Sequence, residues 1–218
     1  MRLWKSLRFA LCAAFLSLSF GATASAAVLA VDFADNPLLF RCQTTVLGCN
    51  LGYTFQVTQA VTIVSLGVFN DSTDGLNNNH PVGLWDASHS LIAQAVVDSS
   101  STSVASASGL GEWLFTAITP FTLTPGTYTI AAFYPATQDE VIRSASTNFT
   151  ADGIVLGLPV QGFAGSLTEP TTQVNTTRFG YFGPSFEIAA PEPSTAGLLV
   201  IGAAFALALL KISRARCS

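Results

Sequence analysis

Charged residues are scarce in this chain. Only 10% of its 218 residues are Asp, Glu, Lys or Arg, whereas 50% are hydrophobic. The mean hydropathy of +0.49 is high for one soluble domain, so a segment in contact with a membrane is expected. The apolar content excludes a disordered chain, and the length suits one folded core with short additional segments.

Basic residues are almost absent from the middle of the chain. Between Ala27 and Ala190 there is no lysine, and three arginines stand against twelve carboxylates, which gives this segment a net charge of −9. Nucleic-acid binding needs several cationic contacts to phosphates, so this class of function is excluded. An acidic surface instead favours solubility and offers weak sites for divalent cations.

The motifs of common enzyme classes are also missing. No G-x-S-x-G, H-E-x-x-H, P-loop or dinucleotide-binding glycine pattern occurs. His80 and His89 flank one predicted strand, but without a clear third ligand we favour polar surface residues over a metal pair. Asp139 and Glu140 are adjacent in sequence and cannot flank a glycosidic bond. We therefore predict that the protein is not an enzyme.

The N-terminal residues have the layout of a secretory signal peptide. Basic residues within the first eight positions are followed by an apolar run from Phe9 to Phe20 and by small residues from Gly21 to Ala27. We predict a signal peptide over residues 1–26 with cleavage after Ala26, and cleavage after Ala24 is the alternative. The apolar run is short for a membrane-spanning helix.

A second apolar segment lies near the C-terminus. Residues 196–210 carry no charge and are followed by three basic residues, Lys211, Arg214 and Arg216. We predict a transmembrane helix over residues 196–212. With Thr195 included, its roughly 27 Å length is just under a hydrocarbon core of about 30 Å. The positive-inside rule places the basic tail in the cytoplasm and the preceding domain outside.

The tripeptide Pro191-Glu192-Pro193 stands immediately before this predicted helix. Residues 191–218 as a whole, with tripeptide, apolar helix and basic tail in order, resemble a PEP-CTERM sorting signal. The resemblance implies that an exosortase, a membrane-embedded cysteine peptidase, recognises the tail and releases or transfers the exported protein. Pro191, Glu192 and Pro193 would then be recognition residues of a substrate.

Two cysteines fall in the predicted exported segment, residues 27–190. Cys42 and Cys49 have C-x6-C spacing, which matches neither the C-x-x-C redox motif nor a zinc site. In an oxidising compartment we predict that they form a disulfide. Cys217 belongs to the cytoplasmic tail and is expected to stay unpaired.

Alternation of apolar and polar residues predicts β-strands in residues 27–190, and no helical period stands out. The predicted strands cover residues 53–58, 61–69, 81–85, 91–97, 113–118, 121–123, 127–134, 178–182 and 185–188. The serine-rich residues 98–109 are predicted to be a flexible surface loop, and Pro125-Gly126 to be a tight turn. Seven to nine short strands with turns between them favour an all-β domain, an antiparallel β-sandwich of jelly-roll type.

Several segments of this domain resemble a β-domain found in many PEP-CTERM proteins and, more distantly, DUF4082-like sandwiches. These segments are Val61 to Phe69, Asp74 to Leu76, His80 to Asp86, Leu123 to Tyr128 and Gly180 to Phe186. The resemblance implies an extracellular β-sandwich without an assigned activity.

The polar loop after residue 69 is the best candidate for a metal site. Asn70, Asp71, Asp74 and Asn77 bring oxygen ligands together beside a glycine, which suits calcium, although the spacing is not that of an EF-hand. A plain Asx-rich turn explains the same residues, and no other cofactor is predicted.

We predict an exported protein, anchored in the membrane as an intermediate and then placed at the cell surface or in an extracellular matrix such as a biofilm. Its predicted role is structural or adhesive, and its predicted partners are the exosortase-type peptidase and extracellular polysaccharide. The alternatives are a secreted hydrolase without a motif and a carbohydrate-binding module. For the latter, Trp85, Trp113 and Tyr134 would form an exposed platform, whereas strand aromatics are first expected in the core.

Overall fold

The structure is a computed structural model. The structure describes residues 27–33, 38–42, 47–71, 75–135, 139–143, 148–174 and 182–190. The predicted signal peptide and the predicted sorting signal lie outside these residues. The described residues all belong to one compact unit, Ala27–Ala190.

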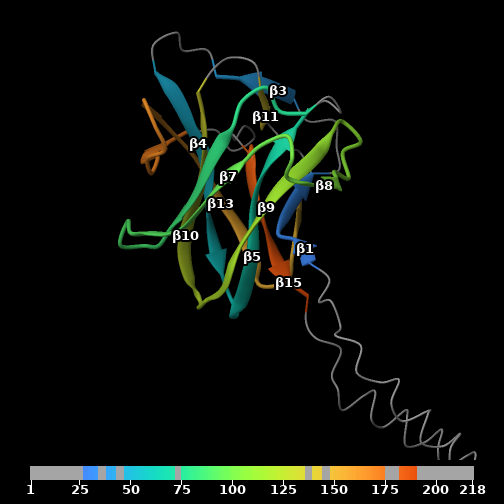
Figure 1. The fold of residues 1–218 in the computed structure, drawn as a ribbon. Helices are drawn as coiled ribbons and strands as arrows, with labels where there is room; N and C mark the ends of the chain where they lie inside the picture. Colours follow the sequence, from blue (N-terminus) through green and yellow to red (C-terminus); the bar gives the residue numbers. More distant parts are fainter. Residues whose placement is uncertain are drawn as a thin grey trace, which may run out of the picture. The chain divides into compact units, whose positions relative to one another are not determined.

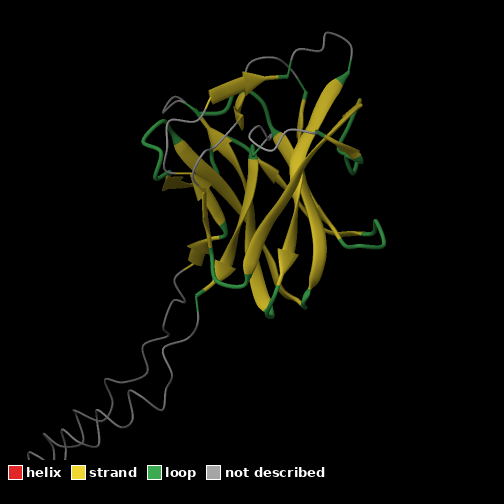
Figure 2. Ribbon diagram, turned by 180° about the vertical axis from the view of Figure 1, so that it is seen from behind, coloured by secondary structure: helices red, strands yellow, loops and turns green. Residues whose placement is uncertain are grey.

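The described residues form β-strands and no helix (Figures 1 and 2). A five-stranded sheet has the order β1 (Ala27–Leu29), β15 (Pro184–Ala189), β5 (Val61–Asn70), β9 (Glu112–Leu123) and β8 (Thr102–Ala105). A six-stranded sheet has the order β14 (Thr172–Gln173), β13 (Ile154–Ala164), β4 (Gly48–Val57), β10 (Gly126–Tyr134), β6 (His80–Trp85) and β7 (Leu91–Val97). Two small sheets pair β11 (Glu140–Arg143) with β3 (Leu38–Arg41) and β12 (Asn148–Thr150) with β2 (Val31–Phe33). Every pairing is antiparallel, as predicted.

One apolar core lies between the two large sheets. Alternate residues of β4 point into it, and Leu51, Tyr53 and Phe55 are at most 1% exposed because side chains of a strand alternate between its two faces. The ring of Phe55 lies 4.9 Å from that of Phe186 on β15 in the opposite sheet. Contacts of this kind across the layers give the described domain a sandwich-like architecture.

The predicted strands within residues 53–134 are confirmed, with 113–118 and 121–123 forming one strand, β9, and the predicted strand at 185–188 lies in β15. The sequence did not predict β1, β2, β3, β8 or the strands β11 to β14. β13 was not predicted because glycine and proline interrupt its pattern, and a bulge lies between Leu156 and Pro159. β8 lies inside the serine-rich residues 98–109, so the prediction of one surface loop there is wrong. β8 is held at the sheet edge by pairing with β9.

The first and last described residues lie side by side. β1 pairs with β15 so that Ala27 is opposite Ala189, and both ends of the domain leave it at this edge (Figure 1). Among the described residues, no helix has the length and apolar character needed to cross a membrane. The predicted helix at 196–212 is not among them.

Candidate functional site

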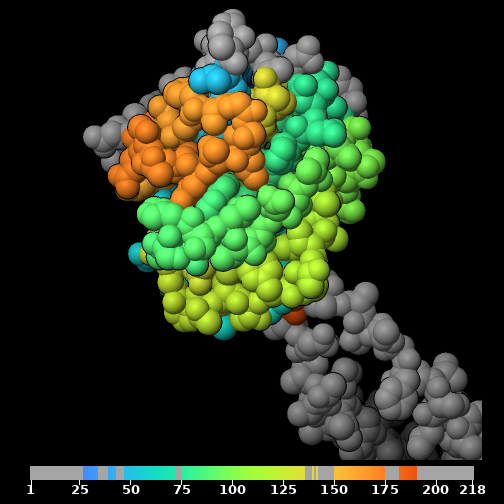
Figure 3. Space-filling model, turned by 60° about the vertical axis from the view of Figure 1, so that its left-hand side comes forward, coloured from blue at the N-terminus to red at the C-terminus, as the bar shows by residue number. Residues whose placement is uncertain are grey.

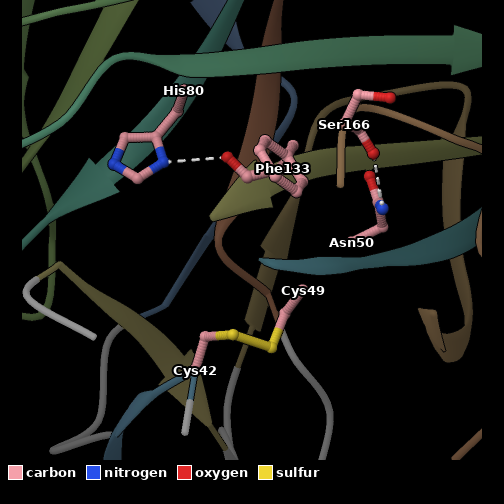
Figure 4. The surroundings of a disulfide bond; sticks show 6 residues. All are labelled: Cys42, Cys49, Asn50, His80, Phe133 and Ser166. Atoms are coloured by element: carbon pink, nitrogen blue, oxygen red, sulfur yellow. Dashed lines mark hydrogen bonds between the residues drawn. A yellow bond between two sulfur atoms is a disulfide. The ribbon is translucent and has the colours of Figure 1, made fainter. Parts of the chain in front are cut away.

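Cys42 and Cys49 form a disulfide, which confirms the predicted pair. Cys42 directly follows β3 and Cys49 is the second residue of β4, with their Cα atoms 5.9 Å apart. Figure 4 shows the bridge. Both cysteines are buried, at 1% and 2% exposure. The bridge fastens the start of β4 to the chain that precedes it.

Reduction of this bridge should weaken the domain measurably. Replacing both Cys42 and Cys49 by serine is expected to lower the free energy of unfolding by about 2 to 3 kcal/mol, because the short loop they close then gains entropy in the unfolded state. Urea unfolding of the variant and the parent, both under oxidising conditions, would measure the difference. Under reducing conditions the parent should match the variant, and a persistent difference would contradict this account.

His80, the first residue of β6, is completely buried near the bridge. Its Nδ1 lies 3.0 Å from the carbonyl oxygen of Phe133 and its Nε2 lies 3.0 Å from Oδ2 of Asp139. A carbonyl and an ionised carboxylate only accept hydrogen bonds. A protonated imidazole would donate to both acceptors at once, and the two side chains lie within ion-pair distance of each other.

Asp139 also orders the loop that precedes His80. Its Oδ1 accepts hydrogen bonds from the backbone N–H and side-chain Nδ2 of Asn77. Its Oδ2 accepts hydrogen bonds from the backbone N–H and side-chain Nδ2 of Asn78. Burial alone would raise the pKa of Asp139, but the bonds from His80, Asn77 and Asn78 outweigh it and hold the pKa well below its usual range. The carboxylate is thus ionised and fully occupied.

Tyr134 completes this cluster, which consists of His80, Asp139, Asn77, Asn78 and Tyr134. Its ring lies 4.6 Å from that of His80. Burial, together with the negative charge of Asp139, raises the pKa of its hydroxyl. No hydrogen-bond partner for that hydroxyl is found among the described residues.

The cluster has the properties of a structural anchor. His80 is 0% and Asp139 3% exposed, and both ring nitrogens and both carboxylate oxygens already have protein partners. A general base or metal ligand needs a free lone pair within reach of a substrate or ion. The geometry instead joins the loop at 77–78, β6 and the end of β10 into one unit.

A second anchor holds the loop at 165–171 on the outer side of the six-stranded sheet. Asn50, buried on β4, donates to the carbonyl oxygen of Ser166 (Figure 4). It also donates to Oγ1 of Thr168, and its Oδ1 accepts from the N–H of Thr168. Next in the loop, Glu169 contacts His89 at the tip of the β6–β7 hairpin, with 2.9 Å between Oε2 and Nδ1. Figure 3 shows this loop, in orange, beside the hairpin, in green.

His80 and His89 lie at opposite ends of the β6–β7 hairpin, so they do not form the metal pair considered above. His89 is exposed as expected and has a φ of 65°. His80 is a buried member of the anchor instead of a surface residue.

The four residues predicted to bind calcium are only partly described. Asn70 is 2% exposed, and its Nδ2 lies 3.3 Å from Oε1 of Glu112. Asn77 donates to Asp139 as above, Asp71 directly follows β5, and Asp74 is outside the described residues. Within the described part of the chain, no three His, Cys, Asp or Glu side chains come together as a metal site would require. Calcium binding stays a prediction.

The three aromatic residues of the alternative sugar platform belong to the interior. Trp113 and Tyr134 are 0% and Trp85 is 5% exposed, so the expectation of core aromatics is confirmed. Nε1 of Trp113 donates to Oδ1 of Asp32 at 2.9 Å, which satisfies the indole inside the protein.

No family model matches the chain, and neither a curated protein nor a solved structure matches it. The likeness to PEP-CTERM proteins and to DUF4082-like domains therefore stays a prediction from the sequence.

Proposed function

We propose that this chain is an exported protein that an exosortase-type peptidase sorts to the cell surface or the extracellular matrix, where its role is structural or adhesive. The observation that carries the proposal is the order of segments in the sequence. A signal-peptide pattern, an acidic domain, Pro191-Glu192-Pro193, an apolar segment and a basic tail follow one another.

The bounds of the folded unit support this division. The compact unit begins at Ala27, the residue after the predicted cleavage site, and ends at Ala190, the residue before the tripeptide. Both predicted processing points therefore fall outside the strands, where cleavage would leave the core intact. The disulfide suits an oxidising compartment outside the cytoplasm.

We further propose that the exported domain is a jelly roll, and its strand order supports this. Ranked along the chain, eight of its strands are β1, β4, β5, β6, β7, β9, β10 and β15. The five-stranded sheet contains β1, β15, β5 and β9 side by side, which are the first, eighth, third and sixth of these eight strands. The six-stranded sheet contains β4, β10, β6 and β7 side by side, which are the second, seventh, fourth and fifth. This alternation between the sheets is the order of a jelly roll. β8 and the β13–β14 pair extend its edges.

Replacing Pro191, Glu192 and Pro193 together by alanine is expected to stop C-terminal processing. Intact mass spectrometry of the chain recovered from its native host should show a parent that lacks both ends and a variant that keeps residues 196–218. Asp98→Asn, a surface change far from the tail in sequence, serves as the control and should be processed like the parent. A parent that keeps residues 196–218 would overturn the proposal in favour of a permanent membrane anchor.

A further inference from the structure

β7 is the outermost strand of the six-stranded sheet and pairs only with β6. Three of its apolar side chains are strongly exposed: Leu91 at 46%, Ile92 at 36% and Val96 at 51%. A bulge between the pairs Leu84↔Ala93 and Trp85↔Leu91 makes Ile92 an extra residue, which explains two successive exposed side chains. From Ala87 to Val97 the chain carries no Asp, Glu, Lys or Arg.

At Gln94 the backbone of this edge is open to a further strand. The carbonyl of Val96 accepts a bond from Oγ1 of Thr116 at 2.9 Å, so it points away from β6 toward the edge. In an antiparallel strand, residues two apart direct their N–H and C=O groups to the same side. Gln94 therefore also presents both groups to the edge, and no described strand pairs with them. Natural proteins usually cover or charge such an edge.

The opposite sheet leaves room beside β7. β8 extends that sheet one strand beyond β9, and Ser103 of β8 pairs with the buried Leu114, which puts both side chains on the core-facing side. Ser103 and Ala105 are nevertheless exposed, so no strand of the six-stranded sheet covers them. A strand added to β7 would extend the six-stranded sheet on this side.

We propose that β7 is the surface through which two copies of this chain associate, by antiparallel pairing of the two β7 strands about a two-fold axis at Gln94. This register places Ile92 opposite Val96 of the second copy. Asp98 then lies opposite Ser90, so no two carboxylates face each other across the pair.

The position of the chain ends favours a second copy as the partner. Both ends leave the domain at the β1–β15 pair, and β1 is the outermost strand of its sheet at the edge opposite to β8. Copies held at a surface through either end thus keep β7 free for one another. The proposal concerns self-association and holds whether or not the tail is processed by an exosortase.

A charge placed on β7 tests this. Val96→Lys should raise the dimer dissociation constant of the exported chain about tenfold or more in analytical ultracentrifugation, because it puts a buried lysine into each half of the interface. Val155→Lys is the matched control, since Val155 is similarly exposed, at 49%, on β13 near the other edge of the same sheet. It should leave the dissociation constant unchanged.

Cross-linking tests the register. Gln94→Cys should give a covalent dimer on mild oxidation, because directly opposed residues in a hydrogen-bonded pair have Cα atoms about 5.5 Å apart, within disulfide range. Gln56→Cys, the same substitution at an exposed position of the central strand β4, should not. A monomeric parent, equal effects of the two lysine variants, or equal cross-linking of the two cysteine variants would overturn the proposal.

Discussion

Asp139→Ala is expected to lower the free energy of unfolding by about 3 to 5 kcal/mol, because it leaves several buried donors without an acceptor, at about 1 to 3 kcal/mol each. His80 would keep its place in the interior without an acceptor for Nε2, and the N–H groups of Asn77 and Asn78 would lose their acceptor as well. Urea unfolding followed by tryptophan fluorescence would measure the change. Asp98→Ala removes an exposed carboxylate that bonds only within its own turn, and it should leave the urea midpoint almost unchanged.

The same pair predicts how stability depends on pH. The pKa of Asp139 is lowered in the folded protein, so the folded state holds the proton less well than the unfolded state, where the pKa is about 3.9. The stabilisation by Asp139 is therefore complete above the unfolded pKa and is lost as the pH falls below it. Asp139→Asn should flatten the loss of stability between about pH 4 and pH 2. A variant with the same acid profile as the parent would show that Asp139 is not the group that titrates.

The sequence predicted those parts of the fold that depend on local patterns. β4, β5 and β10 follow the alternation of apolar residues, and the C-x6-C spacing identified the disulfide. β13 was missed because Gly157, Pro159 and Gly162 break this alternation. β13 is placed by its antiparallel pairing with β4, and inside the bulge Oγ1 of Thr54 accepts from the N–H of Leu158 at 2.9 Å. That contact joins residues about a hundred positions apart, and no local pattern marks it.

The His80 cluster was missed for the same reason. Asp139 had been considered only as a neighbour of Glu140, and Asn77 only as a member of the polar loop. The pairing of β10 with β6 brings the chain after Tyr134 back to the start of β6, and this joins two segments about sixty residues apart. A signal was present in the asparagines directly before a histidine that begins an apolar strand, but it names neither the partner carboxylate nor its burial.

The second large effect is expected at Asp32, a buried carboxylate of β2 that ties three segments together. Its Oδ1 accepts from Nε1 of Trp113, from Oγ of Ser106 and from the N–H of Phe33, and its Oδ2 accepts from the N–H of Ala107. Asp32→Ala leaves the indole of Trp113, which is 0% exposed, without an acceptor. Each unsatisfied buried donor costs about 1 to 3 kcal/mol, so a total loss of about 3 kcal/mol or more is expected.

Asp32→Asn separates hydrogen bonding from charge, because its amide keeps one acceptor oxygen for the indole. It should recover part of the loss in urea unfolding, while Trp113→Phe, which removes the donor, should make Asp32→Ala less costly in the double variant than in the parent. Hydrogen exchange would show where the anchor acts: in Asp32→Ala the amide of Ala107 should lose protection, since its acceptor is gone. Unchanged protection there, with additive losses at Asp32 and Trp113, would mean that the two side chains stabilise the domain independently. The serine-rich segment between β8 and β9 would then be held by something other than Asp32.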